Sequence, residues 1–135
     1  MKRDKLKQWI RNYEGCKLKP YVDTVGKLSI GIGRNLTDRG LSKTEVELLF
    51  DNDIDEVERQ LLEFDWYVNS PSAIKDALFN MCFNLGINRL LDFKRMIKAI
   101  KEENYTIAAM EALNSQWAMQ VPSRAKDIAA MIREA

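Results

Sequence analysis

The 135-residue sequence contains no histidine. Histidine is the usual base beside a serine or cysteine nucleophile and a frequent zinc ligand. Its absence therefore excludes nucleophiles that are paired with histidine, and it excludes the usual histidine zinc sites. The 20 Asp and Glu residues are left as the leading candidates for acid–base chemistry.

Cysteine is scarce as well. Cys16 and Cys82 lie far apart and form no Cys-x-x-Cys motif. We expect two free thiols that pack as small apolar groups in a reducing compartment. The alternative is a disulfide between them.

Long hydrophobic runs are also missing. No run reaches the roughly 18 apolar residues that span a bilayer. The basic start of the chain lacks the apolar core of a signal peptide, because Lys7, Gln8 and Arg11 interrupt it. We therefore expect a protein that stays in the cytoplasm, inserts into no membrane and needs another agent for its release.

The rest of the composition is that of a globular protein, with 46% hydrophobic and 30% charged residues. We expect one monomeric domain over residues 1–135. Residues 1–19 hold seven Lys or Arg and two acids, whereas residues 45–65 hold nine acids and one Arg. The basic segment could attract nucleic acid or cell wall, but a solvated helix face explains it more simply, and we do not expect a nucleic-acid partner.

Apolar residues recur at helical spacing near the N-terminus: Leu6, Trp9, Ile10 and Tyr13. Gly15 should end this helix, with Glu14 in its last turn. Residues 17–21 and 27–32 alternate like short strands around the turn residues 23–26. The sequence therefore predicts a helix followed by a small β-hairpin.

A long helix is predicted over residues about 42–64. It begins with the capping-box sequence Ser42-Lys43-Thr44-Glu45, and it would join a small lobe of residues about 14–45 to a helical lobe of residues about 70–135. Its acids lack the glycine and the closing glutamate of a calcium loop, so we expect no metal at the aspartates Asp51, Asp53 and Asp55.

The helical lobe should be built around residues 73–85, where apolar side chains leave little polar surface. Further amphipathic helices are predicted at residues 94–101, 106–113 and 122–133. The N-terminal helix is expected to belong to this lobe.

Glu14 and Asp23 are the candidate catalytic pair. The helix end and partial burial should keep Glu14 protonated, whereas Asp23 lies in a wet turn that should keep it ionised. Cleaving an acetal needs one carboxyl of each kind, and the hydroxyl of Ser29 on the next strand could orient a water. The pair is weak evidence by itself, because 20 acids occur in the chain.

These positions resemble the signature of the bacteriophage lysozyme (endolysin) family of the T-even type: Glu14-Gly15, Tyr21, Asp23, Gly26, Ser29 and Gly31-Ile32-Gly33. The likeness continues over nearly the whole chain, through Leu49-Phe50, Asp53, Ala77-Leu78, Asn80-Met81, Phe83, Gly86, Phe93, Trp117, Gln120, Pro122 and Arg124-Ala125-Lys126.

The resemblance implies a lysozyme-like α+β fold, mostly helical, with a small N-terminal β-hairpin lobe joined by a long helix to a helical C-terminal lobe. It implies a muramidase that hydrolyses the β-1,4 bond between N-acetylmuramic acid and N-acetylglucosamine in peptidoglycan, with no cofactor and no metal. Glu14 would be the general acid and Asp23 the second carboxylate. Ser29 would hold the water, and Arg124 would pair with Glu14.

The resemblance also implies substrate contacts at Phe83 and Asn84, and we add Asn35 as a candidate. Two positions depart from the family pattern, because Ser29 replaces a threonine and Arg34 replaces the usual histidine. The loop from residue 35 to residue 41 is short for the family.

An endolysin of this type waits in the host cytoplasm until it reaches the wall and lyses the cell. One alternative is a lytic transglycosylase, which needs an acid but not Asp23. Another is a catalytically inactive protein that binds the wall or belongs to the virion.

Overall fold

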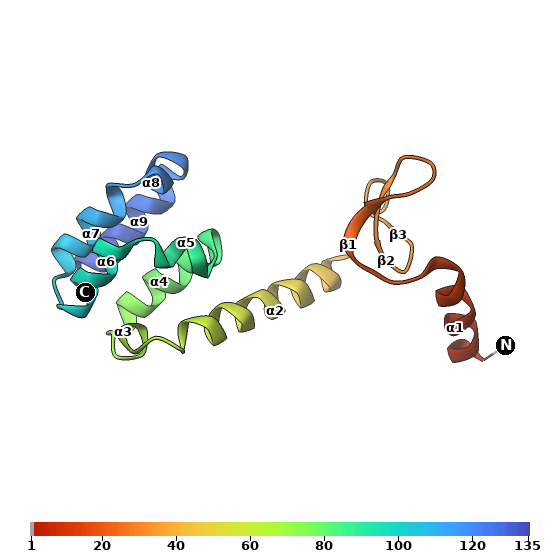
Figure 1. Cartoon of the computed structure of the whole chain (residues 1–135), viewed down its shortest axis with the longest axis horizontal. Coiled ribbons are helices and arrows are strands. Elements are labelled where there is room, and N and C mark those ends of the chain that lie inside the picture. The colour runs from red at the N-terminus through yellow and green to blue at the C-terminus, as the bar shows by residue number, and fades with distance from the viewer. Residues whose placement is uncertain (1) are drawn as a thin grey trace. The chain divides into compact units, whose positions relative to one another are not determined.

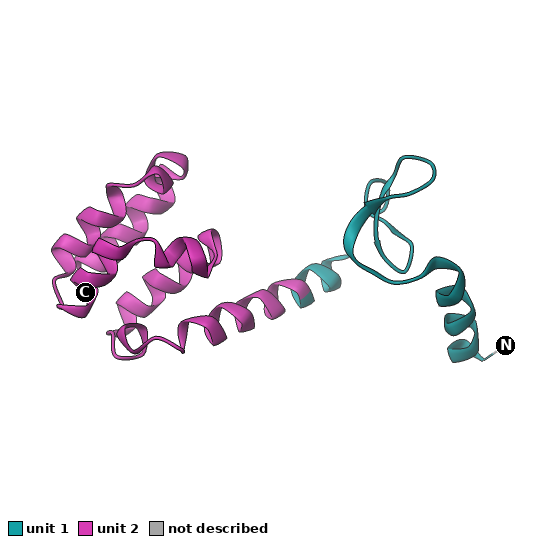
Figure 2. Cartoon of the chain, in the orientation of Figure 1, with its two compact units in different colours: residues 1–48 teal, residues 49–135 magenta. Residues whose placement is uncertain are grey.

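The structure is a computed structural model that describes residues 2–135. Contacts divide the chain into two compact units, Met1–Leu48 and Leu49–Ala135 (Figure 2). The boundary falls inside one continuous helix, α2 (Lys43–Leu61). Helices predominate, and a single three-stranded sheet lies in the first unit. The predicted α+β class is therefore confirmed.

The first unit begins with α1 (Arg3–Glu14), which Gly15 ends by adopting a φ of +70°. This region of backbone conformation favours glycine, so the predicted stop is confirmed and Glu14 is the last helical residue. No residue of α1 is buried. The assignment of this helix to the helical lobe stays a prediction.

The sheet is antiparallel, in the order β1-β2-β3 (Figure 1). Its strands are β1 (Lys17–Val22), β2 (Leu28–Gly31) and β3 (Arg34–Asn35). β1 and β2 are the predicted hairpin, whereas the two residues of β3 are too few to show any alternating pattern. Ser29 lies in the central strand, opposite Tyr21 on one side and Asn35 on the other.

The capping box at the start of α2 is confirmed. The backbone N–H of Ser42 donates to the Glu45 carboxylate at 2.8 Å, and the Glu45 N–H donates to Ser42 Oγ at 3.2 Å. α2 ends at Leu61, a little before the predicted end at about residue 64, and Phe64 is the extended residue that precedes α3 (Asp65–Val68). α3 was not predicted.

In the second unit, α4 (Ser72–Leu85) confirms the predicted central helix (Figure 1). The other predicted helices are α6 (Lys94–Lys101), α7 (Tyr105–Leu113) and α9 (Pro122–Arg133). Two further short helices were not predicted, α5 (Ile87–Leu91) and α8 (Gln116–Gln120).

The core of this unit contains large residues and alanines. Alanine has no bulk beyond Cβ, so buried alanines on α7 and α9 let these two helices pack closely. The alanines are Ala108, Ala109, Ala112, Ala125 and Ala129. The largest fully buried side chains around them are Leu61, Ile74, Leu78, Met81, Leu90, Met96, Ile128 and Ile132.

Both cysteines are free thiols, as predicted. Cys82 is buried, and burial raises the pKa of its thiol to about 11 because the charged thiolate is poorly solvated there. Cys16 is exposed, so its predicted apolar packing is wrong. Among residues 2–135, no helix combines the length and apolar character needed to cross a bilayer.

Candidate active site

The carboxyl group of Glu14 lies against the backbone of Gly33, between β2 and β3. A Cβ atom placed on Gly33 would stand 2.6 Å from Glu14 Oε2 and 2.9 Å from its Cδ. Glycine at this position therefore leaves the space that the Glu14 carboxyl occupies. Glu14 is exposed, so residues of its own unit do not supply the partial burial expected for it.

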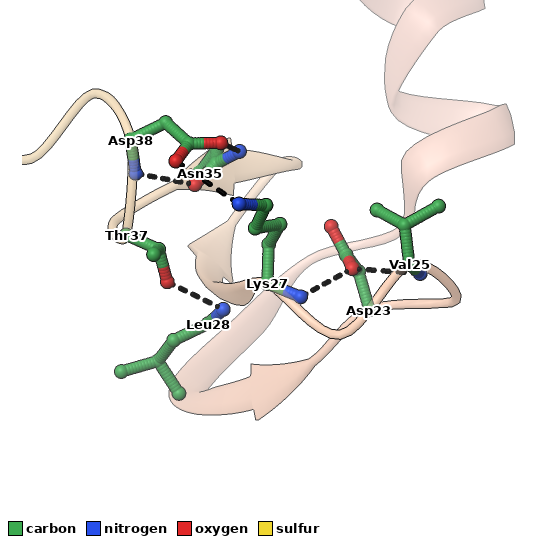
Figure 3. Close-up of polar contacts among 7 residues, drawn as sticks. All are labelled: Asp23, Val25, Lys27, Leu28, Asn35, Thr37 and Asp38. Atoms are coloured by element: carbon green, nitrogen blue, oxygen red, sulfur yellow. Dashed lines mark hydrogen bonds and ion pairs between the residues drawn. The ribbon is translucent and has the colours of Figure 1, made fainter.

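Asp23 is held by the turn that joins β1 to β2. Its Oδ1 accepts hydrogen bonds from the backbone N–H groups of Val25 at 3.0 Å and Lys27 at 2.8 Å (Figure 3). This is the local turn geometry that Asp favours. Both bonds reach the same oxygen, so the turn fixes the carboxylate and leaves Oδ2 without a partner among residues 2–135.

The loop that follows β3 is tied to the same turn (Figure 3). Asn35 donates to the Asp38 carboxylate at 3.1 Å and accepts from the Asp38 N–H at 2.9 Å. Lys27 Nζ reaches Asp38 Oδ1 at 3.2 Å. The amide of Asn35 therefore organises its own loop, and its contact with substrate stays a prediction.

Ser29 is 3% exposed and is the one buried polar residue among residues 2–135. A hydroxyl is both donor and acceptor, so Ser29 can bind a water molecule from the central strand.

Arg34, which departs from the family pattern, belongs to a structural ion pair. Its Nη2 lies 2.6 Å from Glu45 Oε2 and its Nη1 lies 2.7 Å from Glu45 Oε1. Nη1 also donates to the carbonyl of Gly40 at 3.2 Å. The two-point contact joins β3 to the start of α2 and, with the N–H of Ser42, lowers the pKa of Glu45 to about 2.

In the second unit, Arg124 of α9 is anchored on α4. Its Nε donates to Asn80 Oδ1 at 2.8 Å and its Nη2 to the Asn80 carbonyl at 3.3 Å. Phe83 packs edge to face on Phe50, with 5.7 Å between ring centroids. These four residues line one pocket of about 430 Å³, which supports a binding role for Phe83.

Asn84 is joined to α8 by a contact that the sequence did not predict. Trp117 Nε1 donates to Asn84 Oδ1 at 2.7 Å. The Trp117 ring also packs edge to face on Phe93, with 6.1 Å between ring centroids. Trp117 is buried, so the bond orients the exposed Asn84 side chain. No local pattern could have indicated this pair, because the two residues are 33 positions apart.

The candidate residues thus divide between the units. Glu14, Asp23, Ser29 and Asn35 lie in the first, and Phe83, Asn84 and Arg124 lie in the second. The pairing of Arg124 with Glu14 and the catalytic roles stay predictions. The sequence analysis did not predict the contact between the Glu14 carboxyl and Gly33.

Comparison with known proteins shows the family of the chain. The chain matches the family described as "Phage lysozyme" over residues 11–133. It is 31% identical to "Probable T4-type lysozyme 2" of Dictyostelium discoideum over 153 aligned residues, which cover 91% of this chain and 90% of that protein. "Probable T4-type lysozyme 1" of the same organism is 29% identical, with 94% and 92% covered.

A further relative is the "Pre-baseplate central spike protein Gp5" of Enterobacteria phage T4. It is 24% identical, and the alignment covers 94% of this chain but 27% of that protein. The first alignment extends over 153 residues, which is more than this chain contains, so that relative carries residues without counterparts here. The chain belongs to the phage lysozyme family, of T4 type, and is a glycoside hydrolase of the lysozyme class that acts on peptidoglycan.

Proposed function

We propose that this protein hydrolyses the β-1,4 bond between N-acetylmuramic acid and N-acetylglucosamine. Glu14 donates a proton to the glycosidic oxygen, so that the leaving sugar departs as a neutral alcohol. The Asp23 carboxylate either activates a water or attacks the anomeric carbon. A water supplies the hydroxyl of the new reducing end and the proton that restores Glu14.

The observation that carries this proposal is the unequal setting of the two carboxyl groups. Glu14 is the last residue of α1, and its carboxyl group lies against the backbone of Gly33. Asp23 is fixed by two backbone N–H groups that donate to its carboxylate. The two carboxyl groups thus have different surroundings, as the different roles of acid and second carboxylate require.

Ser29 and Arg124 have supporting roles. We assign to the Ser29 hydroxyl the role of holding the water, because Ser29 lies in the strand that adjoins the Asp23 turn. We propose that Arg124 forms an ion pair with Glu14. Asn80 already fixes the Arg124 guanidinium and leaves its Nη1 without a partner in the described chain.

The test is mass analysis of fragments released from purified peptidoglycan by the wild type, Glu14→Gln and Asp23→Asn. The wild type should release muropeptides with reducing N-acetylmuramic acid ends, and both variants should release few. Glu47→Gln, an exposed acid on α2, is the matched control and should behave as the wild type. Fragments with 1,6-anhydro ends would identify a lytic transglycosylase, and no release by the wild type would identify an inactive wall-binding protein.

We further propose that the enzyme acts from the host cytoplasm and lyses the cell once the inner membrane is opened. Bacteria that produce the wild type should stay intact until a pore-forming agent is added and should then lyse. Bacteria that produce Glu14→Gln should not lyse after the same treatment. Lysis without the agent would show that the protein reaches the wall by another route.

A further inference from the structure

A small pocket of the helical unit is lined by residues of α3, α5 and α6. It has a volume of about 310 Å³, at the lower end of the range of ligand-binding pockets. Its apolar lining comes from Trp66, Leu91 and Ile97. Its other lining residues are three exposed lysines of α6: Lys94, Lys98 and Lys101. The pocket thus combines an apolar surface with positive charge, and no acid of the described chain lines it.

The spacing of these lysines costs α6 stability. Residues three and four positions apart are neighbours on a helix, so Lys98 repels both Lys94 and Lys101. Lys94 is also the first residue of α6, where the helix dipole disfavours a cation. The ion pairs among residues 2–135 both lie in the first unit, so no carboxylate neutralises the lysines. An anionic ligand would offset this repulsion.

The positive charge is local. Residues 49–135 carry 10 Lys or Arg and 14 Asp or Glu, so the helical unit as a whole is acidic. A flat anionic surface such as a membrane would meet those acids as well as the lysines. A narrow anionic chain that enters the pocket would meet the lysines alone. The charge pattern therefore favours a thin polymer over an extended surface.

The cations are all lysines, which favours phosphate over carboxylate. Lysine binds phosphate as a compact point charge, whereas arginine is better suited to the two-point contact with a planar carboxylate. Single-stranded nucleic acid is bound by several aromatic side chains along a cationic groove. Here the one aromatic residue in the lining is Trp66, and its ring packs on Phe64 with 5.4 Å between ring centroids. The chemistry thus points to phosphates joined by short carbon chains.

We propose that this pocket binds a polyol phosphate polymer of the bacterial wall. The lysines hold successive phosphate groups, and Trp66 lies against the carbon chain between them. The inference rests on the proposed hydrolysis of peptidoglycan, and it adds a second point of attachment to the same wall. Two linked attachments raise the effective concentration of the enzyme at its insoluble substrate.

The direct test is calorimetric titration of the full chain with a synthetic glycerol phosphate hexamer and with an uncharged glycerol polymer of the same length. The wild type should bind the hexamer and not the uncharged polymer. Its affinity for the hexamer should fall on the order of tenfold between about 50 mM and about 200 mM salt, because neutralised phosphates release counterions. A wild type that binds neither polymer, or both equally, overturns the proposal.

Lys98 tests the lining of the pocket. Lys98→Gln should weaken binding of the hexamer about tenfold, the usual scale for one charged hydrogen bond. Lys126→Gln is the matched control, because it removes the same charge from an exposed position on α9 and should leave binding unchanged. Melting curves check that both variants fold as the wild type does. An equal loss in the two variants would mean that binding follows net charge, and would overturn the assignment to this pocket.

Two other probes identify the source of the phosphate. These are an oligothymidylate with the same number of phosphates as the hexamer and vesicles that contain phosphatidylglycerol. The wild type should bind the hexamer more tightly, per phosphate group, than it binds either probe. Tighter binding of the oligothymidylate or of the vesicles overturns the assignment to a wall polymer.

Hydrolysis separates this inference from the proposed function. The substrates are wall that carries a polyol phosphate polymer and the same wall after chemical removal of the polymer. The wild type should cleave the intact wall with a KM about tenfold lower than that for the stripped wall, and Lys98→Gln should cleave both with one KM. One KM for the wild type overturns the inference and leaves the proposed function standing. Binding of the hexamer without cleavage of either wall contradicts the proposed function and leaves the inference standing.

Discussion

The Glu14 carboxyl group occupies the space that a side chain on Gly33 would fill. A Cβ atom there would lie 2.6 Å from Glu14 Oε2 and 3.4 Å from its Cγ, and the φ of Gly33 is +67°. The glycine therefore allows two things at once, the left-handed turn after β2 and the position of the proposed catalytic acid.

Replacing this glycine should displace the acid. In Gly33→Ala the Glu14 carboxyl must move away, because the end of this side chain is flexible and the backbone of the turn between β2 and β3 is less so. We expect kcat on peptidoglycan to fall on the order of a hundredfold, the cost of misplacing a catalytic group by roughly 1 Å. Steady-state kinetics measure the loss of kcat, and a melting curve measures any loss of stability separately.

Gly31→Ala is the matched control. Gly31 has a φ of +69°, but nothing lies within 4 Å of its Cβ position. It should lose a similar free energy of unfolding, about 1–2 kcal/mol from the left-handed conformation, while kcat stays near that of the wild type. If both variants lose kcat equally, the contact with Glu14 has no role in positioning the acid.

Asp23→Asn should separate charge from geometry. Both backbone N–H groups donate to Oδ1, and the amide oxygen of Asn can accept the same two bonds. We therefore expect an unchanged melting temperature and a loss of activity on the order of 10²–10⁴-fold. Asp23→Ala should lower both the melting temperature and the activity. A fully active Asp23→Asn would mean that Asp23 has no role in the mechanism.

The parts of the fold that could be predicted are those with strong local signals. Gly15 ends α1, and Ser42 with Glu45 begins α2. The apolar residues of α4 are so numerous that the helix had to be buried. In each case the information lies within a few residues of the element it specifies.

The remaining features depend on contacts between distant residues or on very short elements. α3, α5 and α8 have four or five residues each, less than the length over which a helical period is visible. The bond from Trp117 to Asn84 and the seat of Glu14 on Gly33 arise only after the chain has folded. Glu14, Asp23 and Ser29 were proposed from residue type and spacing, whereas Arg124, Phe83 and Asn84 were proposed from the family resemblance.

Leu78 and Met81 test the core of the helical unit. Both are fully buried on α4, so Leu78→Ala and Met81→Ala should each lower the free energy of unfolding by about 2–5 kcal/mol through lost contacts and a cavity. Met119→Ala is the control, since Met119 is 82% exposed. Denaturant unfolding measures the differences, and a loss as large in Met119→Ala would mean that the effect does not come from burial.

The ion pair between Arg34 and Glu45 should give the first unit a defined response to acid. Bonds from Arg34 and from the Ser42 N–H lower the pKa of Glu45 from 4.5 to about 2. A carboxyl whose pKa is lowered by folding stabilises the folded state above its unfolded pKa, and this contribution is lost as the pH falls toward the folded value. The melting temperature of the wild type should therefore exceed that of Glu45→Gln at pH 7, and the difference should shrink below pH 4.5 and vanish near pH 2.

Because the pair is partly exposed, the difference in melting temperature should be largest at low ionic strength. Glu47→Gln should show no such pH-dependent difference, and a gap between wild type and Glu45→Gln that stays constant down to pH 2 would mean that the pair does not hold the start of α2.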